Sequence, residues 1–293
     1  MNRIAAIDIG TNSTRLLVAE RCGGGLKALE TGLITTRLGE GMGGGVLLPG
    51  AMERTMEAVN SFYQIALRLG AERVVAAATS AVRDASNRDE FLDGVRRKTG
   101  LRVRVLSGEE EAAMSYRGVL SGLAVVPRST VVVDVGGGST EFIWNQEGRL
   151  RLASVNVGAV RMTEADLGEE AVAARLSPAL VEVQRAQVKT LVGVGGTITT
   201  LAAIDQRLVL YDPDQVHRYC LTATNVSDIL KMLKRMGVEE RKQVPGLQPE
   251  RADIIVAGVA IVKAIMDGLG QGQLLVSECD ILYGLVLEEV ETN

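Results

Sequence analysis

The stretch at residues 131–142 reads VVVDVGGGSTEF. It begins with a run of valines, a β-branched residue that is typical of buried β-strands. Asp134 interrupts this run near its end, three glycines follow, and Glu141 stands where apolar residues resume. Apolar runs on both sides of a short turn predict a strand–turn–strand hairpin. The hairpin would carry one carboxylate on each side of a glycine triplet.

Two other segments share this pattern of an apolar strand followed by a turn of small residues. Residues 4–20, IAAIDIGTNSTRLLVAE, predict a second hairpin, in which Asp8 precedes the glycine. Residues 190–204, TLVGVGGTITTLAAI, predict a strand that leads into a helix. Because Asp8 and Asp134 occupy matching places, we interpret the two hairpins as an internal duplication.

Patterns of strands and helices alternate along the rest of the chain, which favours sheets covered by helices. A length of 293 residues is suited to two domains. We therefore expect two α/β domains, at residues 1–124 and 125–293. No low-complexity linker separates the halves, so we expect them to share a cleft.

The composition narrows the class of protein. Hydrophobic residues make up 46% of the chain and charged residues 23%, as in soluble globular proteins. No apolar run is long enough to span a membrane, and the start MNRIAAIDIG lacks the apolar core of a signal peptide, so we expect a cytoplasmic protein. The net charge of −4 argues against broad binding of nucleic acids. Three isolated cysteines and the single histidine, His217, argue against zinc and His-rich centres but allow Mg²⁺ held by carboxylates.

The glycine-rich turns indicate phosphate binding. Glycine lets the backbone approach an anion closely, and successive N–H groups can bind phosphate oxygens. Three such turns in one chain are a stronger indication than one. An aspartate beside phosphates needs a cation between them, which suggests Mg²⁺. The alternative is ordinary turn chemistry, in which the aspartates accept backbone N–H groups.

A cluster of three glutamates follows in LSGEEEAAMSYRGVL. Ser107 and Glu110 have the spacing of a capping box, and acidic residues suit the first turn of a helix, so a helix start explains the cluster without a function. Glu111 differs, because a helical repeat places it on one face with Ser115, Gly118 and Gly122. A face of such small residues would be open to close approach.

The segment ATSAVRDASN at residues 77–86 predicts a strand that runs into a turn of small residues carrying Arg83. An arginine at this place could bind a phosphate through two N–H groups. A surface arginine without a ligand is the alternative.

Taken together, these segments resemble the Ppx/GppA family of exopolyphosphatases and guanosine pentaphosphate phosphohydrolases. The resemblance rests on IAAIDIGTNSTRLLV, ATSAVRDASN, SGEEEA, VVVDVGGGSTEF and VGVGGTITTLAA in this order, and it spans residues 4 to about 270. It implies an α/β protein with two actin-like (ribonuclease H-like) domains of the sugar kinase/heat-shock ATPase/actin superfamily around a central cleft.

The resemblance also implies roles for individual residues. The family's general base falls on Glu111, and its metal-linked carboxylates fall on Asp8, Asp134 and Glu141. Its phosphate-binding arginine falls on Arg83. The other phosphate contacts fall on the three glycine-rich turns, at Asn12, Ser13, Gly136, Gly137, Gly138, Ser139, Gly195, Gly196 and Thr197.

Other candidates have less support. Arg15 and Arg37 are further basic residues near the first turn, and Gly158 and Arg161 lie in VGAVRMTE, which resembles another family segment. His217 is expected to form structural hydrogen bonds rather than to act in catalysis, because the family already has a carboxylate base.

The chain departs from the family pattern in two ways. Longer relatives add an HD-like domain, whereas this chain resembles the short two-domain members. Short members often carry a segment like SDRGLREG near the C-terminus, and residues 277–284 read SECDILYG. The arginines of that segment are lost, which would weaken phosphate contacts there or mark a subfamily with other substrates.

The resemblance implies a metal-dependent hydrolase that releases terminal phosphate from inorganic polyphosphate, with Mg²⁺ or Mn²⁺ as cofactor. Two alternatives stay open: a guanosine pentaphosphate or nucleotide phosphohydrolase, and a catalytically weak sensor that binds an alarmone or a nucleotide. As partners we expect polyphosphate or a phosphorylated guanosine nucleotide, and neither DNA nor a membrane. The sequence allows a homodimer.

Overall fold

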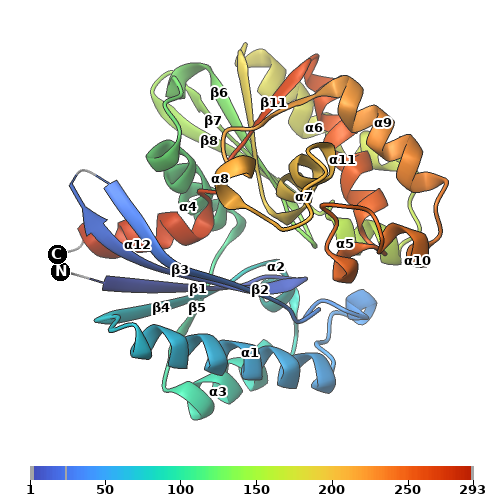
Figure 1. Cartoon of the computed structure of the whole chain (residues 1–293). Coiled ribbons are helices and arrows are strands. Elements are labelled where there is room, and N and C mark those ends of the chain that lie inside the picture. Colours follow the sequence, from blue (N-terminus) through green and yellow to red (C-terminus); the bar gives the residue numbers. More distant parts are fainter. Residues whose placement is uncertain (1–2, 24, 292–293) are drawn as a thin grey trace. The chain divides into compact units, whose positions relative to one another are not determined.

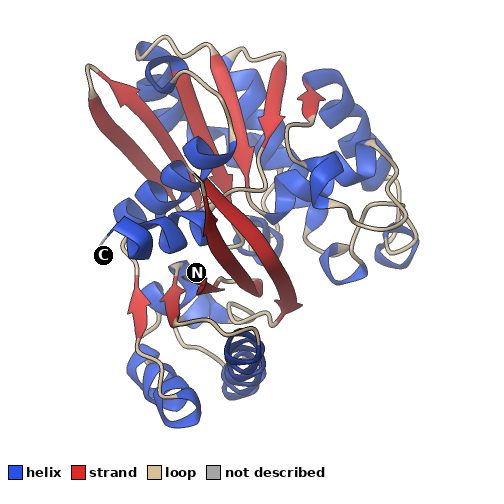
Figure 2. Ribbon diagram, turned by 60° about the vertical axis from the view of Figure 1, so that its left-hand side comes forward, coloured by secondary structure: helices blue, strands red, loops and turns tan. Residues whose placement is uncertain are grey.

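The computed structural model describes residues 3–23 and 25–291. The chain divides into two compact units, each built on its own β-sheet. Unit 1 comprises Met1–Ser121 together with Asp280–Asn293, and unit 2 comprises Gly122–Cys279. Figure 1 labels the elements of both units, and Figure 2 distinguishes their helices from their strands by colour.

Unit 1 contains a five-stranded sheet in the order β3-β2-β1-β4-β5. Strand β1 pairs antiparallel with β2 and parallel with β4, so the turn after β1 and the segment after β4 lie at the same edge of the sheet. The strands are β1 (Arg3–Ile9), β2 (Ser13–Cys22), β3 (Gly25–Thr35), β4 (Arg73–Ala78) and β5 (Val103–Val105). The helices are η1 (Met42–Gly44), α1 (Pro49–Arg68), α2 (Ser80–Asp84), α3 (Arg88–Thr99), α4 (Gly108–Gly122) and α12 (Ile281–Glu291).

Helices cover both faces of the unit 1 sheet (Figure 1). Alternate side chains of β1 point to opposite faces, and they are buried in two different clusters. Ala5, Ile7 and Ile9 pack in the cluster that contains residues of α1 and α3. Ile4 and Ala6 pack in the cluster that contains residues of α4 and α12. This arrangement explains why β1 reads as a continuous apolar run rather than an alternating one.

Unit 2 contains a six-stranded sheet in the order β10-β11-β9-β6-β7-β8. Strands β6 and β7 form the hairpin of the opening stretch, and β9 runs parallel to β6. The strands are β6 (Thr130–Val135), β7 (Thr140–Gln146), β8 (Arg149–Val155), β9 (Thr190–Val194), β10 (Cys220–Thr222) and β11 (Gln273–Val276). The helices are η2 (Pro127–Ser129), α5 (Ala159–Glu164), α6 (Glu169–Arg185), α7 (Gly196–Asp205), α8 (Pro213–Val216), α9 (Ala223–Lys234), α10 (Val238–Arg241), η3 (Pro249–Arg251) and α11 (Ile255–Leu269).

The two sheets share the topology of five strands, to which unit 2 adds β10 as an antiparallel edge strand. In each, three consecutive antiparallel strands are followed by parallel strands that pair with the first of the three: β1 with β4 in unit 1, and β6 with β9 in unit 2. The duplication predicted from the two hairpins is therefore present in the fold. In both units a glycine-rich turn ends up beside a helix that begins at the neighbouring parallel strand, which is where α/β sheets commonly bind ligands.

The structure differs from the expected domain ranges at the C-terminal end. Residues 280–293 belong to unit 1, although the range 125–293 groups them with the second domain. The reason is packing, because Ile281, Leu282 and Leu285 of α12 are buried with Ile4 and Ala6 of β1. A second difference concerns Arg83, which lies on the short helix α2 rather than in a turn.

No helix in the described part of the chain combines the length and the apolar character needed to cross a bilayer.

Candidate active site

The first glycine-rich turn connects β1 to β2 and is fixed by hydrogen bonds to its surroundings. The Gly10 N–H donates to the Ser13 carbonyl at 3.0 Å, which closes the turn. The carbonyl of Asn12 accepts N–H groups from Thr36 and Arg37, at 3.1 and 2.8 Å. The Thr11 hydroxyl lies 2.8 Å from that of Ser80, at the start of α2. The predicted phosphate residues Asn12 and Ser13 are thus buried in a rigid turn beside a helix start.

Arg83 and Glu111 form an ion pair within unit 1. Arg83 Nη1 donates to Glu111 Oε2 at 2.8 Å and to the Leu106 carbonyl at 3.0 Å. Both side chains are largely buried. The structure therefore brings together the predicted base and the predicted phosphate-binding arginine. Such a pair fixes one carboxylate oxygen of Glu111 in place, because a charge-assisted hydrogen bond is strong and directional.

Helix α4 carries Glu111 in its first turn. The capping box predicted for this helix is confirmed, since Ser107 N–H donates to Glu110 Oε2 and Glu110 N–H donates to Ser107 Oγ, at 2.9 and 3.1 Å. The hydrogen bond from the Ser107 backbone and then the one from Arg104 lower the pKa of Glu110. Glu110 is thereby occupied with the helix end, whereas Glu111 is buried and turned to Arg83.

The small residues of α4 serve close packing. A Cβ atom on Gly118 would overlap the carbonyl group of Asp280, and one on Gly284 would overlap the backbone of Met114. Helix α4 and the start of α12 therefore touch backbone to backbone. The face that the sequence suggested would be open to approach is filled at Gly118 by the protein itself.

Asp8 forms a buried charge cluster with Arg15 and Asp280. Asp8 and Arg15 are cross-strand neighbours in the β1–β2 ladder. Arg15 donates through Nε and Nη2 to Asp8 Oδ2, at 3.0 and 2.7 Å, and through Nη1 to Asp280 Oδ2. Burial raises the pKa of Asp8, although the charge of Arg15 opposes this rise. The other oxygen, Asp8 Oδ1, is buried and has no hydrogen-bond partner in the described structure.

The β6–β7 hairpin carries the two carboxylates of the opening stretch. Asp134 lies directly opposite Glu141 in the antiparallel ladder. Side chains that are directly opposite point to the same face, so both carboxylates lie on one face of the sheet. Ser154 Oγ on β8 donates to Glu141 Oε1 at 2.9 Å and orients that carboxylate.

The glycine triplet between these strands is held through its carbonyl groups. The Gly136 carbonyl accepts the Ala159 N–H at 3.0 Å, and the Gly137 carbonyl accepts the N–H groups of Val160 and Arg161 at 2.9 and 3.1 Å. Arg161 Nε also donates to the Gly138 carbonyl at 2.8 Å, which gives the family-like segment VGAVRMTE a structural role. Within the described residues, the N–H groups of Gly137 and Gly138 have no protein acceptor. They are therefore available to an anion.

The third glycine-rich turn lies next to the second. Gly195 has φ of 91°, a left-handed conformation that favours glycine, and it is the N-cap of α7. A Cβ atom at this position would come within 2.6 Å of Asp134 Oδ1. Gly196 and Thr197 follow as the first helical residues, whose N–H groups have no partner within a helix. The predicted residues of the second and third turns therefore converge in unit 2.

Arg251 is a candidate that sequence reasoning missed. Its side chain is almost fully buried, and its guanidinium group lies where a Cβ atom of Gly196 would be. Its Nε donates to Gln248 Oε1 at 3.1 Å. The guanidinium cation of Arg251 lies at the N-terminus of α7, which is the positive end of the helix dipole, and both favour binding of an anion. The only sequence signal was an arginine in QPERAD, a segment far along the chain from the turn.

His217 has both ring nitrogens engaged with the backbone of unit 2. The Glu278 N–H donates to Nδ1 at 3.2 Å, so Nε2 carries the proton and donates to the Gly122 carbonyl at 3.1 Å. Burial lowers the pKa of His217, which keeps the ring neutral. This geometry is that of the structural histidine expected from the sequence.

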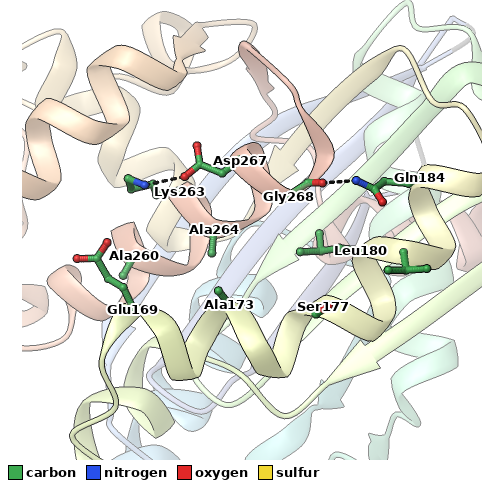
Figure 3. Close-up of a pocket in the computed structure, with 11 residues that line it drawn as sticks. Glu169, Ala173, Ser177, Leu180, Gln184, Ala260, Lys263, Ala264, Asp267 and Gly268 are labelled. Carbon is green, nitrogen blue, oxygen red and sulfur yellow. Dashed lines mark hydrogen bonds and ion pairs between the residues drawn. The ribbon is translucent and has the colours of Figure 1, made fainter.

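A groove of about 450 Å³ lies elsewhere in unit 2, between α6 and α11 (Figure 3). Its lining contains small residues such as Ala173, Ser177 and Ala264, together with Glu169 and an ion pair between Lys263 and Asp267. None of the predicted site residues lines it. Because Lys263 neutralises Asp267, the carboxylate of Glu169 leaves the lining with a net negative charge, which disfavours phosphates.

The carboxylates of this protein could supply only some of the oxygen ligands that Mg²⁺ needs. Among the described residues, no group of three or more His, Cys, Asp or Glu side chains could hold a metal ion. Mg²⁺ is usually bound by one or two carboxylates together with substrate phosphates and water. In unit 2, the carboxylates of Asp134 and Glu141 on neighbouring strands fit this pattern. In unit 1, the unpartnered Oδ1 of Asp8 is a separate candidate ligand.

Comparison with known proteins gives consistent results. A profile of the Ppx/GppA phosphatase family matches residues 17–293. The chain is 35% identical to Exopolyphosphatase 2 of Mycobacterium tuberculosis over 98% of both chains. It is 33% identical to the bifunctional 3-dehydroquinate synthase/phosphatase of Fusobacterium nucleatum, over 99% of this chain and 47% of that protein. The solved structure of the Aquifex aeolicus Ppx/GppA family member superposes with a TM-score of 0.80 at 33% identity, covering 99% of this chain and 98% of the other.

The duplicated sheets and these structural neighbours make the chain an α/β protein of the two-domain actin-like class. With a family match that begins at residue 17 and continues to residue 293, the chain belongs to the Ppx/GppA phosphatase family. It is accordingly a hydrolase of phosphoanhydride bonds.

Proposed function

We propose that this enzyme is an exopolyphosphatase, which releases the terminal phosphate of inorganic polyphosphate. The observation that carries the proposal is the buried Glu111 carboxylate, held by Arg83 at 2.8 Å on the first turn of α4. Hydrolysis of a phosphoanhydride requires a positioned water and neutralised phosphate charge. Glu111 would orient this water and accept its proton.

The terminal phosphates would be bound by backbone N–H groups and arginines. The N–H groups of Gly137 and Gly138, those at the start of α7, and the guanidinium group of Arg251 all favour an anion in unit 2. In unit 1, the phosphate-binding candidates are Asn12, Ser13 and Arg83. Fixed donors of this kind stabilise the charge that develops in the transition state, because they need no reorganisation.

In unit 2, Asp134 and Glu141 would hold Mg²⁺ or Mn²⁺ together with phosphate oxygens and waters. In unit 1, the unpartnered Oδ1 of Asp8 would offer a cation a further carboxylate oxygen. The cation supplies charge neutralisation at the phosphate oxygens. Ser154 keeps Glu141 oriented for this role.

Polyphosphate is favoured over a nucleotide by the relatives, since the chain is 35% identical to an exopolyphosphatase over 98% of both chains. The three cysteines are free thiols, which supports a reducing compartment such as the cytoplasm.

The test compares phosphate release from polyphosphate, guanosine pentaphosphate and ATP at matched Mg²⁺ concentration. We expect the largest kcat/KM with polyphosphate and loss of release when the metal is chelated. A larger kcat/KM with guanosine pentaphosphate would replace the proposal by the nucleotide phosphohydrolase. Absence of release from all three, with binding retained, would point to the sensor.

Replacing Arg251 by Gln should weaken substrate binding. Loss of a charge-assisted bond to phosphate is expected to raise KM about tenfold or more, with a smaller effect on kcat. The matched control is Arg241→Gln, because Arg241 is a partly buried arginine of the same unit that donates to the carbonyls of Leu233 and Ala252. The control should lower the melting temperature and leave KM unchanged. Equal KM values for both variants would remove Arg251 from the phosphate site.

A further inference from the structure

The charge cluster of Asp8, Arg15 and Asp280 has a feature that a simple ion pair lacks. Both hydrogen bonds from Arg15 to Asp8 go to the same oxygen, Oδ2. The second oxygen, Oδ1, is buried without a partner. A buried carboxylate oxygen that lacks a hydrogen bond is costly, so its persistence calls for a compensating ligand.

Asp280, the third member of the cluster, makes the total charge of the cluster negative. Asp280 Oδ2 accepts from Arg15 Nη1, while its Oδ1 accepts the Leu282 N–H at 3.0 Å at the start of α12. Arg15 is therefore shared by two carboxylates, and the cluster carries one net negative charge. All three side chains are largely buried, so solvent screens this charge only weakly.

We propose that Arg15 and Asp280 are positioning residues that set how strongly Asp8 attracts the divalent cation of the hydrolysis reaction. Arg15 holds Oδ2 and leaves Oδ1 as the only free oxygen of Asp8. Asp280 offsets the charge of Arg15, which would otherwise cancel that of Asp8 and repel a cation. This inference rests on the proposed function, because it concerns the cation of that reaction.

A purely structural role for the cluster gives a different expectation. If the three residues only tied β1, β2 and α12 together, then removal of either Arg15 or Asp280 would loosen Asp8 and weaken cation binding in both cases. If the cluster acts through charge, the two changes have opposite signs. Loss of Asp280 weakens binding, and loss of Arg15 strengthens it.

The experiment measures Mn²⁺ binding without substrate, from the electron paramagnetic resonance signal of free Mn²⁺. The Mn²⁺ site that is lost in Asp8→Asn is taken as the site that depends on Asp8. We expect Asp280→Asn to lower the Mn²⁺ affinity of this site about fivefold and Arg15→Gln to raise it by a similar factor. Charges several ångströms apart in a partly screened interior have effects of this size. The double variant Arg15→Gln/Asp280→Asn, which removes the ion pair as a whole, should return to nearly the wild-type affinity.

The matched control is Glu289→Gln, which removes a carboxylate of α12 that is paired with Arg73 at the surface. It should leave Mn²⁺ binding unchanged. Melting curves identify variants that fail to fold. If a single variant fails to fold, the Mn²⁺ affinity of the double variant is compared with that of the wild type. Shifts of the same sign in the two single variants, no shift in either, a double variant far from the wild type, or no loss in Asp8→Asn would each overturn the inference. Phosphate release by the wild type tests the proposed function separately, since it does not depend on these shifts.

Discussion

Replacing Glu111 by Gln is expected to lower kcat for phosphate release by about 10²–10⁴, the usual contribution of a general base. Gln retains the shape of Glu and can still accept the hydrogen bond from Arg83 Nη1, so the fold and substrate binding should be preserved. An amide cannot take a proton from water, and therefore only the chemical step should suffer. The measurement is kcat and KM for polyphosphate, together with the melting temperature.

The matched control is Glu110→Gln. Glu110 precedes Glu111 in the chain, but it is occupied by the capping box with Ser107, and Gln can replace Glu in that role. This variant should keep the wild-type kcat. If Glu111→Gln retains the full rate, or if both variants lose it equally, Glu111 is not the base.

Replacing Gly118 by Ala is expected to destabilise unit 1 and slow the reaction together. The new Cβ atom would overlap the Asp280 carbonyl, and a backbone atom cannot move aside as a side chain can. Overpacking of this kind costs about 1–3 kcal/mol, or more where backbone must shift, which corresponds to a fall in melting temperature of roughly 2–12 °C. Because α4 also carries Glu111, a displacement of about 1 Å could lower kcat about 10²-fold.

The control for this prediction is Gly50→Ala in α1. Gly50 is exposed and helical, and an added Cβ atom would meet only the Arg54 side chain, at 3.6 Å. Alanine should therefore be neutral or slightly stabilising there, because it has the higher helix propensity. A Gly118→Ala variant that behaves like Gly50→Ala, in both melting temperature and kcat, would contradict the close packing of α4 on Asp280.

The local sequence pattern is sufficient to predict where side chains lie within a single turn or hairpin of the candidate site. The register of the β6–β7 hairpin follows from its short turn, so Asp134 and Glu141 could be expected on one face. The capping box separated Glu110 from Glu111 for the same reason, since both bonds span only three residues.

Contacts between distant segments could not be predicted in this way. Arg251 reaches Gly196 across more than fifty residues, and Asp280 reaches Arg15 across 265. No periodicity in the sequence encodes such pairs, because they depend on how elements pack. The apolar pattern of residues 281–291 is typical of a helix, but that pattern does not say which sheet the helix covers.

The membership of α12 in unit 1 has a consequence for the order of folding. Unit 2 is one continuous stretch, so the ribosome has made all of it once Cys279 is added. Unit 1 is interrupted, and the face of its sheet that carries Ile4, Ala6 and Leu17 stays without α12 until residues 280–291 emerge. Domains commonly fold in the order of their synthesis. Here the unit that is begun first is the one that is finished last.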